Sequence, residues 1–288
     1  MYYSPISIDK PKRAARRPLR APGLSHYALG MPQPPSWRTA LVTGAAGGIG
    51  RSFAATLAAR GVAVGLIDVS IDGLAAAAAA IQSTGGQAAT RVADVSDALV
   101  LEAAVAELVA TLGALDAVIH CAAILGPGHF GTQPAETFER VIRINLLGTA
   151  NVVRAVLPAL RASRGAIACL ASTAAVHGWP ALGAYSAAKF GVAGFCDAIR
   201  PELRRDGVTL TSVFPLLIDT PLLGGSDLPP ILRGRRLPPA TVVEKTLVAV
   251  AQRRPRVFIP GSVRVVAALH GIAPSLLDWY GRRFGFAR

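Results

Sequence analysis

A glycine-rich loop between a strand and a helix limits the folds open to this chain more than any other feature. Residues 43–50 read Thr-Gly-Ala-Ala-Gly-Gly-Ile-Gly, directly after the strand-like run 39–42 and before a helix-like run. Gly44 permits a tight turn, and Gly48 and Gly50 let the backbone approach a phosphate at the N-terminus of the helix. A glycine-rich loop can also be a plain turn, so the rest of the chain decides between the two.

The rest of the chain alternates short apolar runs with helical stretches. Because alternating strands and helices imply parallel pairing through right-handed crossovers, we expect an α/β, doubly wound Rossmann fold with a mainly parallel seven-stranded sheet. The predicted strands lie around residues 41–42, 62–67, 88–93, 115–120, 166–171, 208–214 and 257–259. The predicted helices cover residues 49–60, 71–82, 98–112, 136–160, 183–205 and 241–252.

Length and composition indicate one large domain with two tails. The 288 residues suit a Rossmann domain over 37–260, a disordered basic tail over 1–36 and an apolar, basic helical extension over 261–288. Three cysteines without C-x-x-C spacing argue for reduced thiols in the cytoplasm, and against a disulfide framework or a metal site. The Arg16-Arg17 pair lacks a following apolar run, so we expect no secretory signal.

The net charge of +13 is concentrated at the two ends of the chain. Residues 1–37 carry six basic and one acidic side chain, residues 38–225 carry 13 of each, and residues 226–288 carry 11 basic and three acidic ones. Basic ends can attract phosphate backbones or anionic lipid. No basic motif with interleaved aromatic residues accompanies them, so we expect no nucleic-acid partner.

A phenol and an ammonium group are placed for acid–base chemistry in the predicted helix from Gly183. Tyr185 and Lys189 are four residues apart and therefore share a helix face. A cation lowers the pKa of a neighbouring phenol from about 10, which would let Tyr185 transfer protons near pH 7. Ser172 follows a buried strand, where α/β enzymes place their chemistry. Taken alone, Tyr-x-x-x-Lys is as typical of a helix surface pair.

Together these motifs resemble the classical short-chain dehydrogenase/reductase family, of the hydroxysteroid or retinol type, over about residues 37 to 260. The resemblance implies an NAD(H)-dependent oxidoreductase that interconverts a secondary alcohol and a ketone. Ser172 would bind the substrate oxygen, Tyr185 would transfer its proton, and Lys189 would bind the nicotinamide ribose. Asn145 would lie at a helix distortion and order a relay water. The alternatives are an idle NAD-sensing or scaffold protein on the same fold, and a 3-oxoacyl-thioester reductase.

Asp68 bears on the choice of cofactor. It lies eighteen residues after Gly50 at the end of the second predicted strand, where it would accept hydrogen bonds from ribose hydroxyls and repel a 2′-phosphate. This favours NAD over NADP, although Asp68 is equally placed to be a helix N-cap. The resemblance implies further cofactor contacts at Gly44, Gly48, Ile49, Gly50, Asp94, Val95, Ala122, Tyr185, Lys189, Pro215, Ile218 and Thr220.

The sequence departs from the family pattern at two loops. His120-Cys121-Ala122-Ala123 stands where the family has Asn-Asn-Ala-Gly, and Leu216 replaces a glycine. His120 would be either a structural histidine or a replacement for the hydrogen bonds of the asparagine. Cys121 is expected to be a small buried hydrophobic residue.

Apolar residues in the predicted active-site loops favour a lipophilic substrate, although the same residues could simply pack the loops. They are Ile124, Leu125, Val176, Trp179, Leu216, Leu217, Leu222 and Leu223. The resemblance also implies a homo-oligomer, either a dimer or a tetramer.

The C-terminal extension is too interrupted by charges to span a membrane, and two short helices broken at Pro274 fit it better. It could be a lid, a contact between subunits, or a weak peripheral attachment to anionic lipid.

Overall fold

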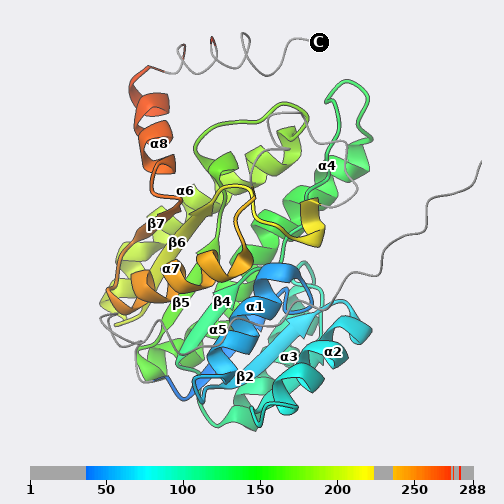
Figure 1. Ribbon diagram of the computed structural model, residues 1–288, viewed down its shortest axis with the longest axis vertical. Helices are drawn as coiled ribbons and strands as arrows, with labels where there is room; N and C mark the ends of the chain where they lie inside the picture. Colours follow the sequence, from blue (N-terminus) through cyan, green and yellow to red (C-terminus); the bar gives the residue numbers. More distant parts are fainter. Residues whose placement is uncertain (1–36, 224–235, 274, 276–278, 280–288) are drawn as a thin grey trace, which may run out of the picture. The chain divides into compact units, whose positions relative to one another are not determined.

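A computed structural model describes residues 37–223, 236–273, 275 and 279 (Figure 1). The predicted N-terminal tail and most of the chain after Ile272 lie outside the described residues.

The described strands form one parallel sheet in the order β3-β2-β1-β4-β5-β6-β7. The strand order reverses between β1 and β4, which is the topological switch point of a doubly wound Rossmann fold. This confirms the predicted fold class. The strands are β1 (Thr39–Thr43), β2 (Ala63–Asp68), β3 (Ala88–Val92), β4 (Ala117–His120), β5 (Ala166–Leu170), β6 (Thr209–Pro215) and β7 (Arg256–Ile259).

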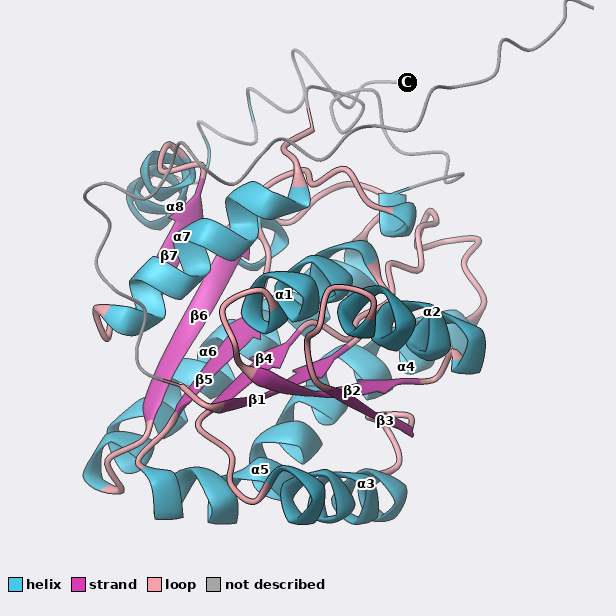
Figure 2. Ribbon diagram, turned by 60° about the horizontal axis from the view of Figure 1, so that its bottom comes forward, coloured by secondary structure: helices cyan, strands magenta, loops and turns pink. Residues whose placement is uncertain are grey.

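Helices cover both faces of the sheet (Figure 2). One face packs against α1 (Gly48–Ala58), α2 (Ile71–Gln82) and α7 (Pro239–Ala251). The other face packs against α3 (Ala98–Leu112), α5 (Gly148–Ser163) and α6 (Gly183–Arg205). Because both faces are covered, the central strands β1, β4 and β5 are buried along their whole length and read as continuous apolar runs.

The helix predicted over residues 136–160 is a more complex element. It consists of α4 (Ala135–Ile142), a π-helical turn (Arg143–Leu147) and α5. The run is helical as predicted, and the π-helical turn contains Asn145, where the family resemblance implies a helix distortion. By length and a mean hydropathy of 1.2, the run Ala135–Ser163 could cross a membrane. Here its residues Val152 and Val156 are fully buried in the core beneath the sheet, and buried core helices meet the same criterion.

A further short helix, α8 (Val263–Ile272), follows β7. It corresponds to the first of the two helices expected in the C-terminal extension. The predicted break at Pro274 lies outside the described residues.

Candidate active site

Two adjoining cavities lie at the carboxyl ends of the strands. The larger, of about 290 Å³, is lined by nine of the predicted cofactor-binding residues: Gly44, Gly48, Ile49, Gly50, Asp68, Asp94, Val95, Ala122 and Thr220. The smaller, of about 90 Å³, is lined by Ser172, Tyr185, Lys189, Pro215 and Ile218 among others. The two cavities adjoin each other, because five residues line both of them: Ile49, Cys121, Ala123, Thr220 and Leu222.

The glycine-rich loop leaves no room for side chains against the larger cavity. Gly44 has a φ of +66°, and a Cβ there would lie 2.7 Å from the backbone nitrogen of Ala122. A Cβ on Gly50 would lie 2.1 Å from the carbonyl oxygen of Gly44. Helix α1 begins after Gly47 with neither a capping side chain nor an acidic residue in its first turn. Its N-terminus is therefore electropositive and open to a phosphate, as a dinucleotide cofactor requires.

Asp68 presents a fixed carboxylate to the larger cavity. Its Oδ2 accepts a hydrogen bond from the backbone N–H of Ala46, and its Oδ1 accepts one from that of Ser70, each at 3.0 Å. The N-cap of α2 is Ser70, whose hydroxyl oxygen accepts from the Gly73 N–H at 3.1 Å. The alternative reading of Asp68 as the N-cap is therefore wrong.

Ser172, Tyr185 and Lys189 converge in the smaller cavity. Ser172 follows β5, and its oxygen accepts a hydrogen bond from the Ala174 N–H at 3.1 Å, so its hydroxyl hydrogen can point elsewhere. Tyr185 and Lys189 lie in the first two turns of α6. Lys189 Nζ donates to the Leu170 carbonyl at 2.7 Å and lies 5.6 Å from the centre of the Tyr185 ring. The surface-pair reading is wrong, because both side chains are buried.

Burial has the largest effect on the pKa values of Tyr185 and Lys189. It raises the pKa of Tyr185, and a hydrogen bond with Ser172 lowers that pKa in part. Burial also lowers the pKa of Lys189 to about 8, against the opposing influence of three nearby thiols, those of Cys121, Cys169 and Cys196. The predicted lowering of the Tyr185 pKa by Lys189 is thus corrected, because desolvation disfavours the phenolate.

Asn145 lies in the π-helical turn and lines neither cavity. Its Oδ1 accepts a hydrogen bond from the Ile124 N–H at 2.9 Å, and its Nδ2 donates to the Ile124 carbonyl at 2.8 Å. The side chain is fully buried, so the alternative of a solvent-facing helix asparagine is wrong.

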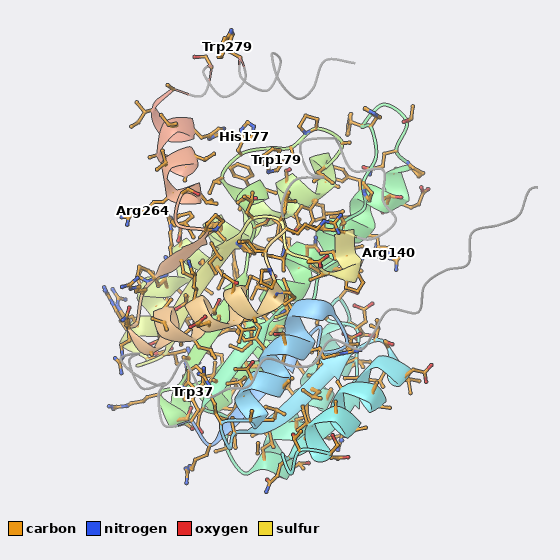
Figure 3. The ribbon with its side chains drawn as sticks, viewed as in Figure 1. Trp37, Arg140, His177, Trp179, Arg264 and Trp279 are labelled. Atoms are coloured by element: carbon orange, nitrogen blue, oxygen red, sulfur yellow. The ribbon has the colours of Figure 1, made fainter. Side chains whose placement is uncertain are left out.

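Three polar residues near the site were not singled out as functional from the sequence. Thr43 and Thr149 form hydrogen bonds with the two ring nitrogens of His120, at 2.7 and 2.9 Å. Arg140, on α4, lines the larger cavity (Figure 3). Of these three, only Thr149 could have been found from the sequence, because it lies one helical turn after Asn145.

The walls of the smaller cavity are mainly apolar. Six of the eight predicted loop residues line it: Leu125, Trp179, Leu216, Leu217, Leu222 and Leu223. Ile124 instead lines the larger cavity, and Val176 packs against the core on the α5 side of the sheet. Cys121 lines both cavities, and burial raises the pKa of its thiol, as suits a small hydrophobic residue.

Comparison with known proteins agrees with this geometry. The family model for short chain dehydrogenase matches residues 38–228. The chain is 40% identical over 188 residues to 2-dehydro-3-deoxy-L-rhamnonate dehydrogenase (NAD(+)) of Sphingomonas sp. (strain SKA58), covering 65% of this chain and 74% of that protein. It is 36% identical over 188 residues to cyclohexanol dehydrogenase of Acinetobacter sp. (strain SE19), covering 65% and 75%.

A solved structure shows the same likeness. Actinorhodin polyketide ketoreductase with NADPH superimposes with a TM-score of 0.71 at 28% identity, covering 79% of this chain and 97% of that chain.

This protein belongs to the short-chain dehydrogenase family, as its motifs indicated. It is an oxidoreductase that acts on CH–OH groups and their carbonyl counterparts. Its relatives include both an NAD(+) enzyme and an NADPH complex, so the comparisons do not decide between NAD and NADP as the cofactor of this chain.

Proposed function

We propose that this protein interconverts a lipophilic secondary alcohol and its ketone with NAD(H), using Tyr185 as the general acid and base. One observation carries the proposal. The cavity lined by Ser172, Tyr185 and Lys189 adjoins the cavity lined by the glycine-rich loop and Asp68, and five residues line both.

The residues of the larger cavity fit a dinucleotide. The N-terminus of α1 lines this cavity without a cap, and Gly44 and Gly50 let the loop pack tightly against the backbone at Ala122 and against itself. Asp68 would hold the adenine ribose, and Thr220, which lines both cavities, would meet the nicotinamide end. When bound, NAD(H) supplies the hydride acceptor or donor.

The residues of the smaller cavity handle the proton. The Ser172 hydroxyl donates a hydrogen bond to the substrate oxygen, and the Tyr185 oxygen takes the alcohol proton or returns it to the ketone. Lys189 holds a positive charge beside the phenol. Because burial raises the Tyr185 pKa, the phenol predominates at neutral pH and donates readily to a ketone. Alcohol oxidation requires the phenolate, so its rate should rise with pH.

The apolar walls support a lipophilic substrate. Trp179, Leu217 and Leu223 line the smaller cavity and pack together with Tyr185 in one apolar cluster. Apolar walls favour a substrate whose own apolar surface they can bury, and they offer few hydrogen-bond partners to the hydroxyl groups of a polyol.

The proposal is tested by turnover. Purified protein is assayed with NAD(H) and NADP(H) on a panel of steroid, retinoid, cyclic, long-chain and sugar alcohols, with the matching ketones and a 3-oxoacyl thioester, at pH 7 and pH 9. We expect turnover of the lipophilic members, faster oxidation at pH 9, and a loss of about 10²- to 10⁴-fold in kcat for Tyr185→Phe.

Cofactor titration by protein fluorescence is the control, and Tyr185→Phe should bind NADH nearly as wild type does. Near-native turnover by Tyr185→Phe would remove Tyr185 from the proposed role. Preference for sugar alcohols would reject the lipophilic substrate. Dinucleotide binding without turnover of any panel member would favour the NAD-sensing alternative.

A further inference from the structure

We propose that His120 and Thr149 are positioning residues that hold the backbone carbonyl of Asn145 for proton transfer. The inference rests on the proposed function and on the role that the family resemblance implies for Asn145, which is to order a relay water. It concerns a position where this chain departs from its family, since His120 stands in place of an asparagine.

The three contacts form one continuous chain of hydrogen bonds. Thr149 Oγ1 donates to the Asn145 carbonyl at 2.6 Å, which uses its single hydrogen. At its 2.9 Å contact with His120, Thr149 must therefore accept, so the proton is on His120 Nε2. His120 Nδ1 is then an acceptor and receives the hydroxyl hydrogen of Thr43 at 2.7 Å. Every donor in the chain has an acceptor, and this requires a neutral imidazole in one tautomer.

The residues that form this series of hydrogen bonds are buried away from water. Thr43 and Asn145 are 0% exposed, Thr149 is 1% exposed and His120 is 2% exposed. Burial and, to a smaller extent, the charge of Lys189 lower the pKa of His120 to about 3, so the ring is neutral at any working pH. Because no solvent can replace a lost partner, removing one hydroxyl leaves a buried group without a hydrogen bond.

The last residue of β4 and the segment that follows the strand hold Asn145 at two points. Ile124 pairs with its side-chain amide through two hydrogen bonds, and His120 holds its carbonyl through Thr149. A π-helical turn inside a helix is rare and often marks a functional site. Asn145 lies in this turn, and the hydrogen bond from Thr149 fixes the orientation of its carbonyl.

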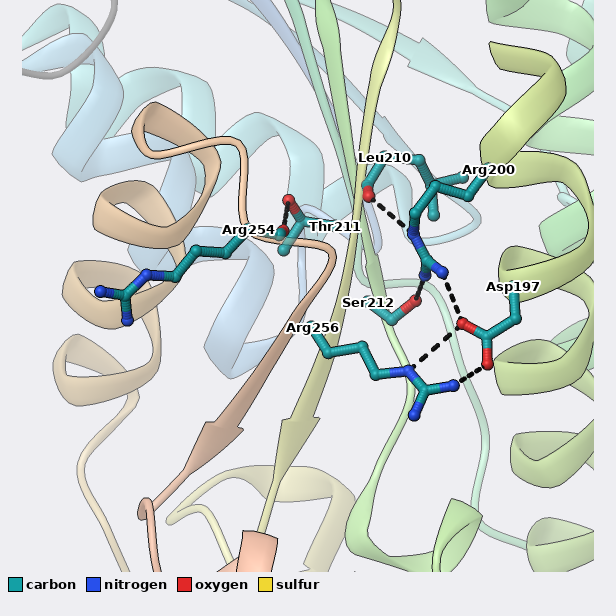
Figure 4. A network of polar contacts seen from close by, with 7 residues as sticks. All are labelled: Asp197, Arg200, Leu210, Thr211, Ser212, Arg254 and Arg256. Carbon is teal, nitrogen blue, oxygen red and sulfur yellow. Dashed lines mark hydrogen bonds and ion pairs between the residues drawn. The ribbon is translucent and has the colours of Figure 1, made fainter. Parts of the chain in front are cut away.

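Two substitutions separate a positioning role from mere stability. Thr149→Val removes the hydroxyl at nearly constant volume, and Thr149→Ser keeps it. The matched control is Thr211→Val. Thr211 lies in β6, is also fully buried and lines neither cavity. Its hydroxyl donates a hydrogen bond to the Arg254 carbonyl at 2.8 Å (Figure 4). All variants are assayed for kcat, KM and the pH dependence of kcat, with thermal unfolding measured alongside.

We expect Thr149→Val to lower kcat about tenfold while the KM for cofactor and substrate changes less than about twofold, because the proton step and not binding is disturbed. The pH profile of kcat should shift by at least about half a unit. Thr149→Ser should restore most of the rate, and Thr211→Val should leave kcat and the profile unchanged. Equal effects of the two valine variants on kcat would overturn the inference, as would a failure of serine to rescue.

A second measurement on the wild type needs no variant to fold. Nitrogen-15 NMR of the histidine rings should show His120 neutral and protonated on Nε2 down to about pH 5. A ring protonated on Nδ1, or one that becomes charged in this range, would overturn the inference. A wild type without turnover would overturn the proposed function and the inference together, whereas an active wild type with unaffected Thr149→Val overturns the inference alone.

Discussion

At the scale of single residues, burial and backbone contacts decide what each side chain can do. The Asp68 carboxylate is held by two backbone N–H groups at the edge of the larger cavity. Each of its oxygens keeps free lone pairs for ribose hydroxyls. A second negative charge beside it, such as a 2′-phosphate, would be repelled.

Asp68→Asn should therefore weaken the discrimination between cofactors. The wild type is expected to bind NADH more tightly than NADPH, and the ratio of the two dissociation constants should fall about tenfold or more in the variant. Fluorescence titration measures both constants. Asp72→Asn is the control, because Asp72 is exposed on α2 and lines neither cavity. Equal affinities in the wild type would refute the assignment of Asp68.

His120 should make the protein sensitive to acid. Burial holds its pKa at about 3 in the folded state, against 6.5 as its ordinary value. The unfolded state therefore binds more protons between these two values, so stability falls as pH decreases through this window. From pH 6.5 to 4.5 this loss is about 2 kcal/mol.

Urea unfolding at the two pH values, for the wild type and for His120→Asn, measures this effect. The variant should lose about 2 kcal/mol less than the wild type on acidification. His129→Asn, at an exposed loop position, should behave as the wild type does. An unchanged pH dependence in His120→Asn would contradict the assignment.

At the scale of elements, α8 reaches the substrate cavity through a series of aromatic contacts. The His270 ring on α8 lies 5.5 Å from that of His177 and 6.3 Å from that of Phe190. His177 in turn lies 5.4 Å from Trp179, which lines the smaller cavity. Figure 3 shows His177 and Trp179 beside α8, with Arg264 on the other side of the helix.

His270→Ala should therefore loosen the wall of the substrate cavity. Since an aromatic pair contributes about 0.5 to 1.5 kcal/mol, we expect KM to rise about two- to tenfold for a large lipophilic substrate. For a small cyclic alcohol and for the cofactor, KM should stay unchanged. Steady-state kinetics measure KM for the two substrates and for the cofactor. Arg264→Ala, on the opposite side of α8, is the control. A uniform rise in KM for both substrates would argue against this contact as a specificity element.

At the scale of the whole domain, the two ends of the sheet serve different purposes. The carboxyl ends of the strands carry the cavities, and the amino ends of β6 and β7 are joined to α6 by an ionic network (Figure 4). Asp197 accepts hydrogen bonds from Arg200, at 2.6 Å, and from Arg256. Arg200 also donates to the Leu210 carbonyl and to the Ser212 hydroxyl. The network thereby connects the edge strand β7 to the helix that carries Tyr185 and Lys189.

Asp197→Asn should destabilise the fold moderately. Burial raises the Asp197 pKa, but hydrogen bonds from Arg256 and Arg200 lower it more, so the carboxylate stabilises the folded state above its ordinary pKa of 3.8 and loses this effect as pH falls. Because the cluster is partly exposed, we expect a loss of about 1 kcal/mol at neutral pH, reduced by high salt.

Urea unfolding in low and high salt measures this loss. Asp206→Asn, which breaks a single exposed pair with Arg161, should cost less. Equal losses in the two variants, or no salt dependence, would contradict a role for the network.

The sequence alone determined the order of the elements, the glycine-rich loop and the shared helix face of Tyr185 and Lys189. Helices α2, α3 and α6 begin and end where the sequence predicts, because periodicity, capping residues and turn residues act over a few positions. The carboxyl-end placement of Ser172 and Asp68 followed from the same alternation of strands and helices.

Only the tertiary structure decided what surrounds these residues. The π-helical turn, the partners of Asn145 and the tautomer of His120 depend on contacts between residues 21 to 77 positions apart in the chain. The predicted direction of the Tyr185 pKa shift was wrong for the same reason, since desolvation by the folded chain raises this pKa more than the hydrogen bond with Ser172 lowers it. Local patterns specify backbone conformation, whereas burial and hydrogen-bond partners arise only when distant segments pack together.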